Sequence, residues 1–244
     1  MPRILVTNDD GVYSEGLHAL ADALRSIGDV TVVAPLGEAS AIGHALTIAR
    51  PLRLERLREG VYSVDGTPAD CVNLGVVHVL GGLPDLVVSG INKGYNLGDD
   101  VTYSGTVGGA LEGALLGTPG IAVSLERTAD PFDFGPAAAA AERVAAQVLR
   151  HGLPARTLLN INVPRGVLRG VKVTVQGMRN HVTKVAASVD PRGRPYYWIE
   201  EGEDIYADGD RADHVAVREG YVSVTPLQPD LTAHDMLSLI EKLV

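Results

Sequence analysis

Hydrophobic residues along the first two thirds of the chain alternate between two patterns. Short apolar runs, typical of buried strands, are separated by stretches whose apolar residues recur at helical spacing. Strands are expected at residues 3–7, 30–34, 86–88, 121–123 and 158–163. Helices are expected over 17–27, from Thr67-Pro68 onward, over 107–116 and over 136–150. This order predicts a doubly wound, Rossmann-like α/β fold with a mostly parallel sheet covered on both faces.

The pattern changes near Pro164. Strand-like runs at 171–175 and 221–224 are separated by polar stretches rich in Gly and Asp, and no helical pattern appears before Leu231 to Leu243. We therefore expect a catalytic core over 1–164 and a β-rich arm with a terminal helix over 165–244. The connection 179–215 is long for a compact core. It fits an arm that pairs with another subunit and a surface hairpin on the same monomer equally well.

Composition and charge narrow the possible functions. The 244 residues carry a formal net charge of −9, which disfavours binding along a nucleic-acid backbone. The single cysteine, Cys71, excludes an internal disulfide. Met1 leads directly into a strand-like run, and no apolar stretch reaches membrane-spanning length. We expect a cytoplasmic protein with no membrane partner.

The strongest chemical signal is Asn8-Asp9-Asp10-Gly11, directly after the first expected strand. Adjacent carboxylates at a strand tip repel each other unless a cation neutralises them. Carboxylate oxygens suit Mg²⁺ or Mn²⁺. The competing explanation is a tight turn, because Asn-Asp and Asp-Gly are common turn residues.

Three further segments carry polar residues that suit a ligand. Ser89 to Gly98 follows the strand at 86–88 and contains Asn92 and Asn96. Tyr103 to Gly108 opens a helix, and a helix N-terminus with Ser104, Gly105 and Thr106 is a natural phosphate cradle. Pro35 to Thr47 contains Ser40 and His44. A flexible loop, an ordinary serine cap and an incidental histidine are the respective alternatives.

The expected meeting of these four segments at one place favours a ligand site over the separate explanations for each segment. Each segment is interpreted as following an expected strand, so the fold would bring them to one rim of the sheet. That rim would hold carboxylates, hydroxyls, amides and a helix N-terminus, while GxGxxG and GxxxxGK[ST] motifs are absent from the sequence. Such a set favours metal-assisted phosphoryl transfer over dinucleotide or triphosphate binding.

The same residues resemble the SurE family, the survival-protein-E nucleotidases. The matching stretches run in order along nearly the whole chain, from Ile4–Gly11, Val33–Pro35 with Ser40, Gly66–Val72, Pro84–Asn92, Asn96–Gly98 and Tyr103–Val107 to Ala122–Ser124, Asn160–Pro164, Thr225–Leu227 and Asp230–Thr232. The Asn-Asp-Asp-Gly and Ser-Gly-Ile-Asn motifs together are highly specific.

The resemblance implies a divalent-metal-dependent phosphatase acting on nucleoside 5′- and 3′-monophosphates, and in some members on short polyphosphate. It implies metal ligation by Asp9, Asp10, Ser40 and Asn92, with Mg²⁺ or Mn²⁺ as cofactor. It also implies dimers or tetramers formed through the carboxyl-terminal arm. It also implies phosphate contacts from the loop of Asn96 and from Ser104, Gly105 and Thr106. We add Asn8 and His44 as candidate substrate contacts. This chain reads Gly43-His44-Ala45 where many members carry another Ser or Asn, so contacts in that loop are the least defined.

Three functional hypotheses remain. In the first, a metal-activated water attacks the phosphate of a nucleoside monophosphate, and Asp9 or Asp10 assists as the catalytic base. In the second, a haloacid-dehalogenase-like enzyme uses an aspartyl nucleophile. That family requires Asp-x-Asp, whereas Asp9 and Asp10 are adjacent. The third is a nucleotide-binding protein without catalysis.

Overall fold

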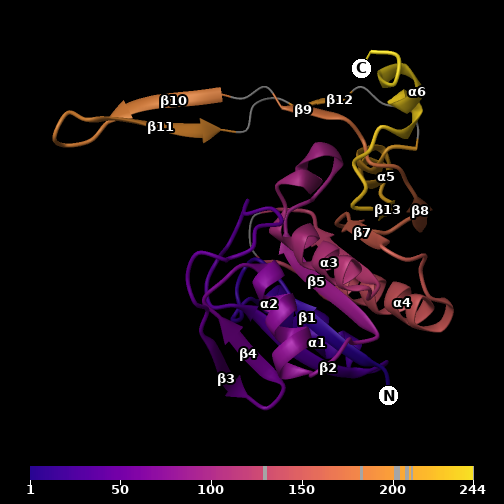
Figure 1. Ribbon diagram of the computed structural model, residues 1–244. Helices are drawn as coiled ribbons and strands as arrows, with labels where there is room; N and C mark the ends of the chain where they lie inside the picture. The colour runs from indigo at the N-terminus through magenta and orange to yellow at the C-terminus, as the bar shows by residue number, and fades with distance from the viewer. Residues whose placement is uncertain (129–130, 182–183, 201–203, 207–208, 210, 244) are drawn as a thin grey trace.

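The central feature of the computed structural model is a mixed β-sheet (Figure 1). The structure describes residues 1–128, 131–181, 184–200, 204–206, 209 and 211–243. Within them, nine strands form one sheet in the order β3-β4-β2-β1-β5-β6-β7-β13-β8. Their bounds are β1 (Arg3–Thr7), β2 (Asp29–Pro35), β3 (Leu54–Arg58), β4 (Val61–Val64), β5 (Leu86–Lys93), β6 (Gly120–Leu125), β7 (Leu158–Val163), β8 (Val171–Val173) and β13 (Val222–Leu227).

The neighbouring strands β4, β2, β1, β5, β6 and β7 are parallel, whereas β3 and β13 pair antiparallel with β4 and β7. The predicted fold class is therefore confirmed. The parallel strands are almost continuously apolar because helices cover both faces of the sheet.

Two layers of helices enclose the sheet. Helices α1 (Glu15–Leu24) and α4 (Gly135–His151) pack together over the face to which Ile4 and Val6 point. Helices α2 (Pro68–Leu74) and α3 (Gly105–Leu116) pack together over the other face, where Leu5 lies against α2. The alternation of Ile4, Leu5 and Val6 between faces follows from the two-residue period of a strand.

Side-chain caps mark the starts of α2 and α3. Thr67 caps α2 through a reciprocal bond with Asp70, and Ser104 accepts a hydrogen bond from the Val107 amide at the start of α3. Ser14 occupies the N-cap position of α1, but its hydroxyl makes no capping bond. Helix α2 continues into a π-helical turn, η1 (Gly75–Val79), and α3 is preceded by a 3₁₀ turn, η2 (Gly98–Thr102).

Strand β5 is longer than expected. The apolar run at 86–88 predicts a strand that ends before Ser89, but the strand continues to Lys93 with a register irregularity between Ser89 and Asn92. Pairing with β1 and then β6 sustains the strand, and Ile91 is fully buried. A Cβ atom on Gly90 would lie 2.4 Å from the Val123 carbonyl oxygen, so glycine permits this close strand contact.

The carboxyl-terminal part contributes both to the sheet and to a projection. Strands β8 and β13 extend the sheet, while β9 (Arg179–His181) pairs with β12 (Asp204–Tyr206). Strands β10 (Lys184–Val189) and β11 (Pro195–Glu200) form a hairpin that lies clear of the sheet and its helices in Figure 1. The connection 179–215 thus contains a hairpin in the described residues. The division of the chain at 164/165 stays a prediction.

One expectation for this part is wrong, and the terminal helix is present but shorter than expected. A helix, α5 (Asp213–Arg218), precedes the tail although no helix was expected there, because six residues are too short to display a periodic pattern. The single helix expected over 231–243 is reduced to a 3₁₀ turn, η3 (His234–Met236), and a short helix, α6 (Leu237–Ile240). Leu231 is 95% exposed, and helices depend mainly on packing for stability. Among the helices of the described residues, none is both long and apolar enough to cross a membrane.

Candidate active site

The candidate site lies where the strand order reverses. From β1 the chain moves to β2 on one side, and later places β5 on the other side of β1. Asp9 and Asp10 follow β1, and Asn92 lies near the end of the adjacent β5. Ligands of doubly wound folds bind at such a reversal, beyond the carboxyl ends of the strands.

Asp9 is held against the N-terminus of α3. Its side chain is 5% exposed and accepts hydrogen bonds from the Thr106 hydroxyl at 2.5 Å and from the Thr106 amide at 3.1 Å. A Cβ atom on Gly105 would lie 2.9 Å from the Asp9 Cβ, so this glycine allows the helix to approach. In this structure the first turn of α3 therefore binds the carboxylate of Asp9.

Both carboxyl groups are destabilised as anions. Burial raises the pKa of Asp9, the hydrogen bonds from Thr106 oppose this, and the charge of Glu38 adds to the rise. Burial and the neighbouring charge of Asp9 raise the pKa of Asp10 to about 6, while the ammonium of Lys93 counteracts them. The Oδ2 atom of Asp10 is buried and has no hydrogen-bond partner in the described residues.

The turn explanation for Asn8 to Gly11 is also realised. The Asn8 side-chain amide donates to the Gly11 carbonyl at 3.0 Å, and Gly11 has a φ of 97°. The carboxamide oxygen of Asn8 is buried without a hydrogen-bond partner among the described residues. The turn presents Asp9 and Asp10 at the sheet edge, so turn chemistry and a ligand site are compatible here.

The loop that carries Ser40 approaches the same edge. The Ala39 amide donates to the Asp9 carbonyl at 2.8 Å, which places Ser40 beside the β1 tip. Ser40 is exposed, and its hydroxyl donates to the Glu38 carboxylate at 2.8 Å. His44, four residues later, forms a 2.5 Å contact from Nε2 to the Glu112 Oε2 atom. His44 was expected on the substrate side, but the structure pairs it with helix α3.

The two asparagines differ in their surroundings. Asn92 is half-buried and donates from its side-chain nitrogen to the Gly94 carbonyl at 3.0 Å. Asn96 is buried and fixed to the ends of β6 and β7 by four hydrogen bonds. Its amide donates to Asn162, its side chain donates to Ser124, and its carbonyl accepts from Asn160 and Asn162. The predicted phosphate contact of Asn96 stays a prediction.

Comparison with known proteins identifies the family of this chain. Residues 4–183 match the family described as Survival protein SurE. The chain belongs to the SurE family. It is 54% identical to the 5′-nucleotidase SurE of Syntrophotalea carbinolica over 94% of this chain and 92% of that one. It is 52% identical to the 5′-nucleotidase SurE of Geobacter sulfurreducens, over 98% and 92%. The crystal structure of the SurE protein from Aquifex aeolicus superposes with a TM-score of 0.88 at 45% identity, covering 99% of both chains.

Sequence reasoning missed several side chains around this SurE site. Glu38 and Lys93 flank Asp10, and the Lys93 ammonium lies 5.2 Å from the ring centroid of Phe132. Asp213 is fully buried and accepts hydrogen bonds from the amides of Gly98 at 2.9 Å and Gly177 at 3.1 Å. Lys93 lay within the Ser89–Gly98 motif and could have been singled out. Asp213 has no local signal, because its partners are distant in sequence.

The oxygen donors at this edge fit a hard divalent cation. No group of three or more His, Cys, Asp or Glu side chains suited to a metal occurs in the described residues. The set at hand is instead two aspartates, a serine hydroxyl and an asparagine amide, which are all oxygen ligands. The buried, unpartnered Asp10 oxygen is the atom that most needs such a cation.

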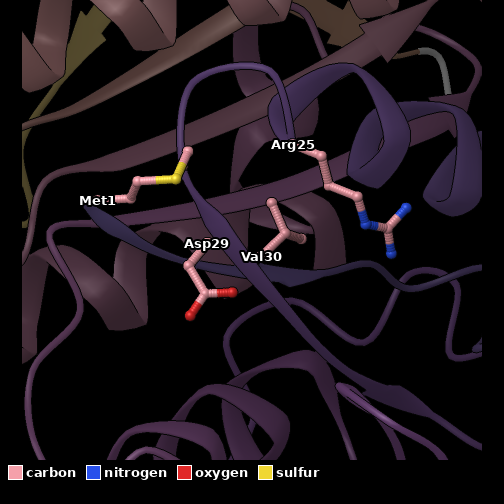
Figure 2. Close-up of a pocket in the computed structure, with 5 residues that line it drawn as sticks. Met1, Arg25, Asp29 and Val30 are labelled. Carbon is pink, nitrogen blue, oxygen red and sulfur yellow. The ribbon is translucent and has the colours of Figure 1, made fainter.

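A hollow at the opposite end of the sheet does not share this chemistry. Figure 2 shows the residues that line it, among them Met1, Arg25, Asp29 and Val30. Its volume is about 520 Å³. Asp29 begins β2, so the hollow lies at the amino end of that strand, and Arg25 pairs with Asp22. Nothing in this hollow matches the carboxylate pair.

Proposed function

We propose that this chain is a 5′-nucleotidase that hydrolyses nucleoside monophosphates to a nucleoside and phosphate with the help of Mg²⁺ or Mn²⁺. The proposal includes 3′-monophosphates and short polyphosphate as further substrates. Membership of the SurE family and the names of its relatives support the reaction class. The observation that carries the metal is the adjacent pair of buried Asp9 and half-buried Asp10, of which Asp10 keeps a buried oxygen without a partner in the described residues.

Asp9, Asp10, Ser40 and Asn92 would hold the cation. Asn92 uses its side-chain nitrogen for Gly94, which leaves the carboxamide oxygen as the metal ligand. A bound divalent cation would polarise the phosphate and lower the pKa of an attacking water. Thr106 orients Asp9 through two hydrogen bonds, so Asp10 is the freer carboxylate. Asp10 would then assist as the base that accepts the proton of that water.

The phosphate would bind at the start of α3. Thr106 donates both of its N–H and O–H groups to Asp9, so we reassign Thr106 from phosphate binding to positioning Asp9. The Ser104 hydroxyl accepts from Val107 and keeps its own proton for donation to a phosphate oxygen. The Gly105 amide is the second donor, at the positive end of the helix dipole. In this proposal Asn8, His44 and Asn96 hold neighbouring parts of the site in place, and none of them has to donate a hydrogen bond to the phosphate.

A second copy of this chain is the proposed partner. The hairpin exposes apolar side chains, with Trp198 65% and Ile199 82% exposed. Exposed apolar clusters of this kind mark protein interfaces. We therefore propose a homodimer or homotetramer formed through the hairpin, located in the cytoplasm as the family resemblance and the lone buried thiol of Cys71 suggest.

Phosphate release from AMP tests the reaction. Protein stripped of metal by a chelator should release no phosphate, and added Mn²⁺ or Mg²⁺ should restore hydrolysis. Full activity of the stripped protein would contradict the metal mechanism. An aspartyl-phosphate trapped by acid quench would favour the haloacid-dehalogenase-like alternative, and absence of turnover with every metal would favour a binding protein.

A further inference from the structure

The loop between β2 and β3 carries Ser40 but has little apolar anchorage. Around Ser40 its large apolar side chains are exposed, with Leu36 at 51%, Leu46 at 50% and Ile48 at 92%, while Leu52, next to β3, packs against a core cluster. Burial of these side chains therefore cannot hold the loop in place. Polar contacts must fix the position of Ser40 instead.

Backbone hydrogen bonds attach the loop at several points. Besides the bond from Ala39 to Asp9, the Gly43 amide donates to the Tyr103 carbonyl at 2.8 Å. The Thr67 hydroxyl donates to the Ala45 carbonyl at 2.7 Å, and the Thr47 amide donates to Asp70 at 2.9 Å. The loop thus lies across the N-terminal ends of α2 and α3.

The His44 side chain adds a contact deeper along α3. Its Nε2 atom lies 2.5 Å from Oε2 of Glu112, which is 5% exposed. The other oxygen of Glu112 accepts a hydrogen bond from the Asn73 side chain at 2.7 Å. Both oxygens of this buried carboxylate are therefore satisfied, one by α2 and one by the loop. Removing His44 would leave one of them unpaired, which is costly in a buried site.

The ionisation of Glu112 matches this role as an acceptor. Burial and the nearby charge of Asp70 would raise its pKa, but hydrogen bonds from His44 and Asn73 hold the pKa below its usual value. Glu112 and Thr106 lie on the same helix, six residues or about 9 Å apart along its axis. Helix α3 is therefore a common frame that holds Asp9 through Thr106 and the Ser40 loop through Glu112.

We infer that His44 is a positioning residue that, through Glu112, holds the loop at 39–47 so that Ser40 stays beside Asp9 and Asp10. His44 does not contact the substrate in this account. The inference rests on the proposed metal site, because it assigns the loop the task of presenting Ser40 to the cation.

The test compares His44→Ala, His44→Gln and Glu112→Gln with wild type and with His151→Ala, an exposed histidine at the end of α4. Mn²⁺ affinity of the metal-stripped protein is measured by calorimetry, alongside kcat and KM for AMP. We expect His44→Ala and Glu112→Gln to weaken Mn²⁺ binding about tenfold and to lower kcat, with KM little changed. His44→Gln should recover much of the loss, since its amide can donate to Glu112. His151→Ala should match wild type.

A substrate-contacting His44 would behave differently. KM would then rise in His44→Ala while Mn²⁺ affinity stayed at the wild-type value, and that result overturns the inference. Circular dichroism checks that each variant is folded. If His44→Ala unfolds, Glu112→Gln carries the test, and unchanged metal binding and kcat in folded Glu112→Gln would also overturn the inference. Asp9→Asn distinguishes failure of this inference from failure of the proposed metal site. Unchanged Mn²⁺ affinity in Asp9→Asn means that the metal site itself is wrong.

Discussion

Two regions depart in opposite ways from the usual placement of charged and apolar side chains. They are the carboxyl edge of β1 and β5, and the β10–β11 hairpin. At the edge, Asp9 is buried beside the half-buried Asp10, whose buried Oδ2 atom has no partner in the described residues. On the hairpin, apolar side chains are exposed, including Tyr197, Trp198 and Ile199. A folded chain gains nothing from either arrangement alone.

The difference indicates what each region binds. Adjacent carboxylates with raised pKa values are poorly stabilised as anions, which supports the proposed cation at the sheet edge. Exposed aromatic and aliphatic side chains require apolar cover, so the hairpin fits another protein surface. Changes at the edge should therefore act on chemistry and metal binding, and changes on the hairpin should act on assembly.

The largest effect is expected from Asp9→Asn or Asp10→Asn. Either change keeps the shape of the side chain but removes charge from the metal site. Turnover with AMP should fall on the order of a hundredfold or more at saturating Mn²⁺. Asp29→Asn, at the opposite end of the sheet, is the matched control and should retain wild-type turnover. Near-normal activity in both site variants would place the chemistry elsewhere.

Thr106→Val should have the next largest effect. Valine removes the hydroxyl that donates to Asp9 and keeps the backbone amide in place. Loss of one hydrogen bond to a charged group costs about 1.5–3 kcal/mol, which corresponds to a roughly ten- to hundredfold fall in kcat/KM. Mn²⁺ affinity should fall as well, because Asp9 is less well oriented. If metal affinity is unchanged and inhibition by inorganic phosphate is lost, Thr106 binds phosphate after all.

On the hairpin, Trp198→Ser combined with Tyr197→Ser should change assembly. Sedimentation at micromolar concentration should show smaller species than wild type, because apolar contact area is removed. Activity per chain should change much less than in Thr106→Val, since the proposed ligands lie in the core. Arg192→Ser, near the hairpin turn, is the control and should sediment as wild type. An unchanged oligomer in the double variant would exclude the hairpin as the interface.

The smallest effect concerns stability without metal. The pKa of Asp10 is about 6 in the fold against a usual value of 3.8, so the native state binds more protons than the unfolded state between these values. The metal-free protein should therefore lose stability as pH rises through this window. Asp10→Asn should melt a few degrees higher than wild type at pH 8, and the difference should disappear near pH 4. A lower melting temperature of metal-free Asp10→Asn at pH 8 would contradict the raised pKa.

Much of the fold and part of the candidate site could be predicted from the sequence, because strand-end motifs such as Asn8–Gly11 are local. The apolar periods predicted the order of strands and helices, and hence the edge of the sheet where Asp9 and Thr106 meet. Glu112 and Asp213 could not be predicted as contacts of the site, since their partners His44 and Gly98 lie 68 and 115 residues away. The helix expected over 231–243 is shorter in the structure for a different reason. The apolar spacing of this segment resembles that of a helix, but no core packs against Leu231 in the described chain.

The most direct measurement is anomalous diffraction from crystals of the metal-stripped protein soaked in Mn²⁺. The account predicts an anomalous peak at the carboxyl ends of β1 and β5, with oxygen atoms of Asp9, Asp10, Ser40 and Asn92 at about 2.1 Å to 2.2 Å. The same peak should be absent from crystals of Asp10→Asn treated in parallel. A fully occupied Mn²⁺ bound elsewhere, with Asp9 and Asp10 free of metal, would contradict the proposed metal site.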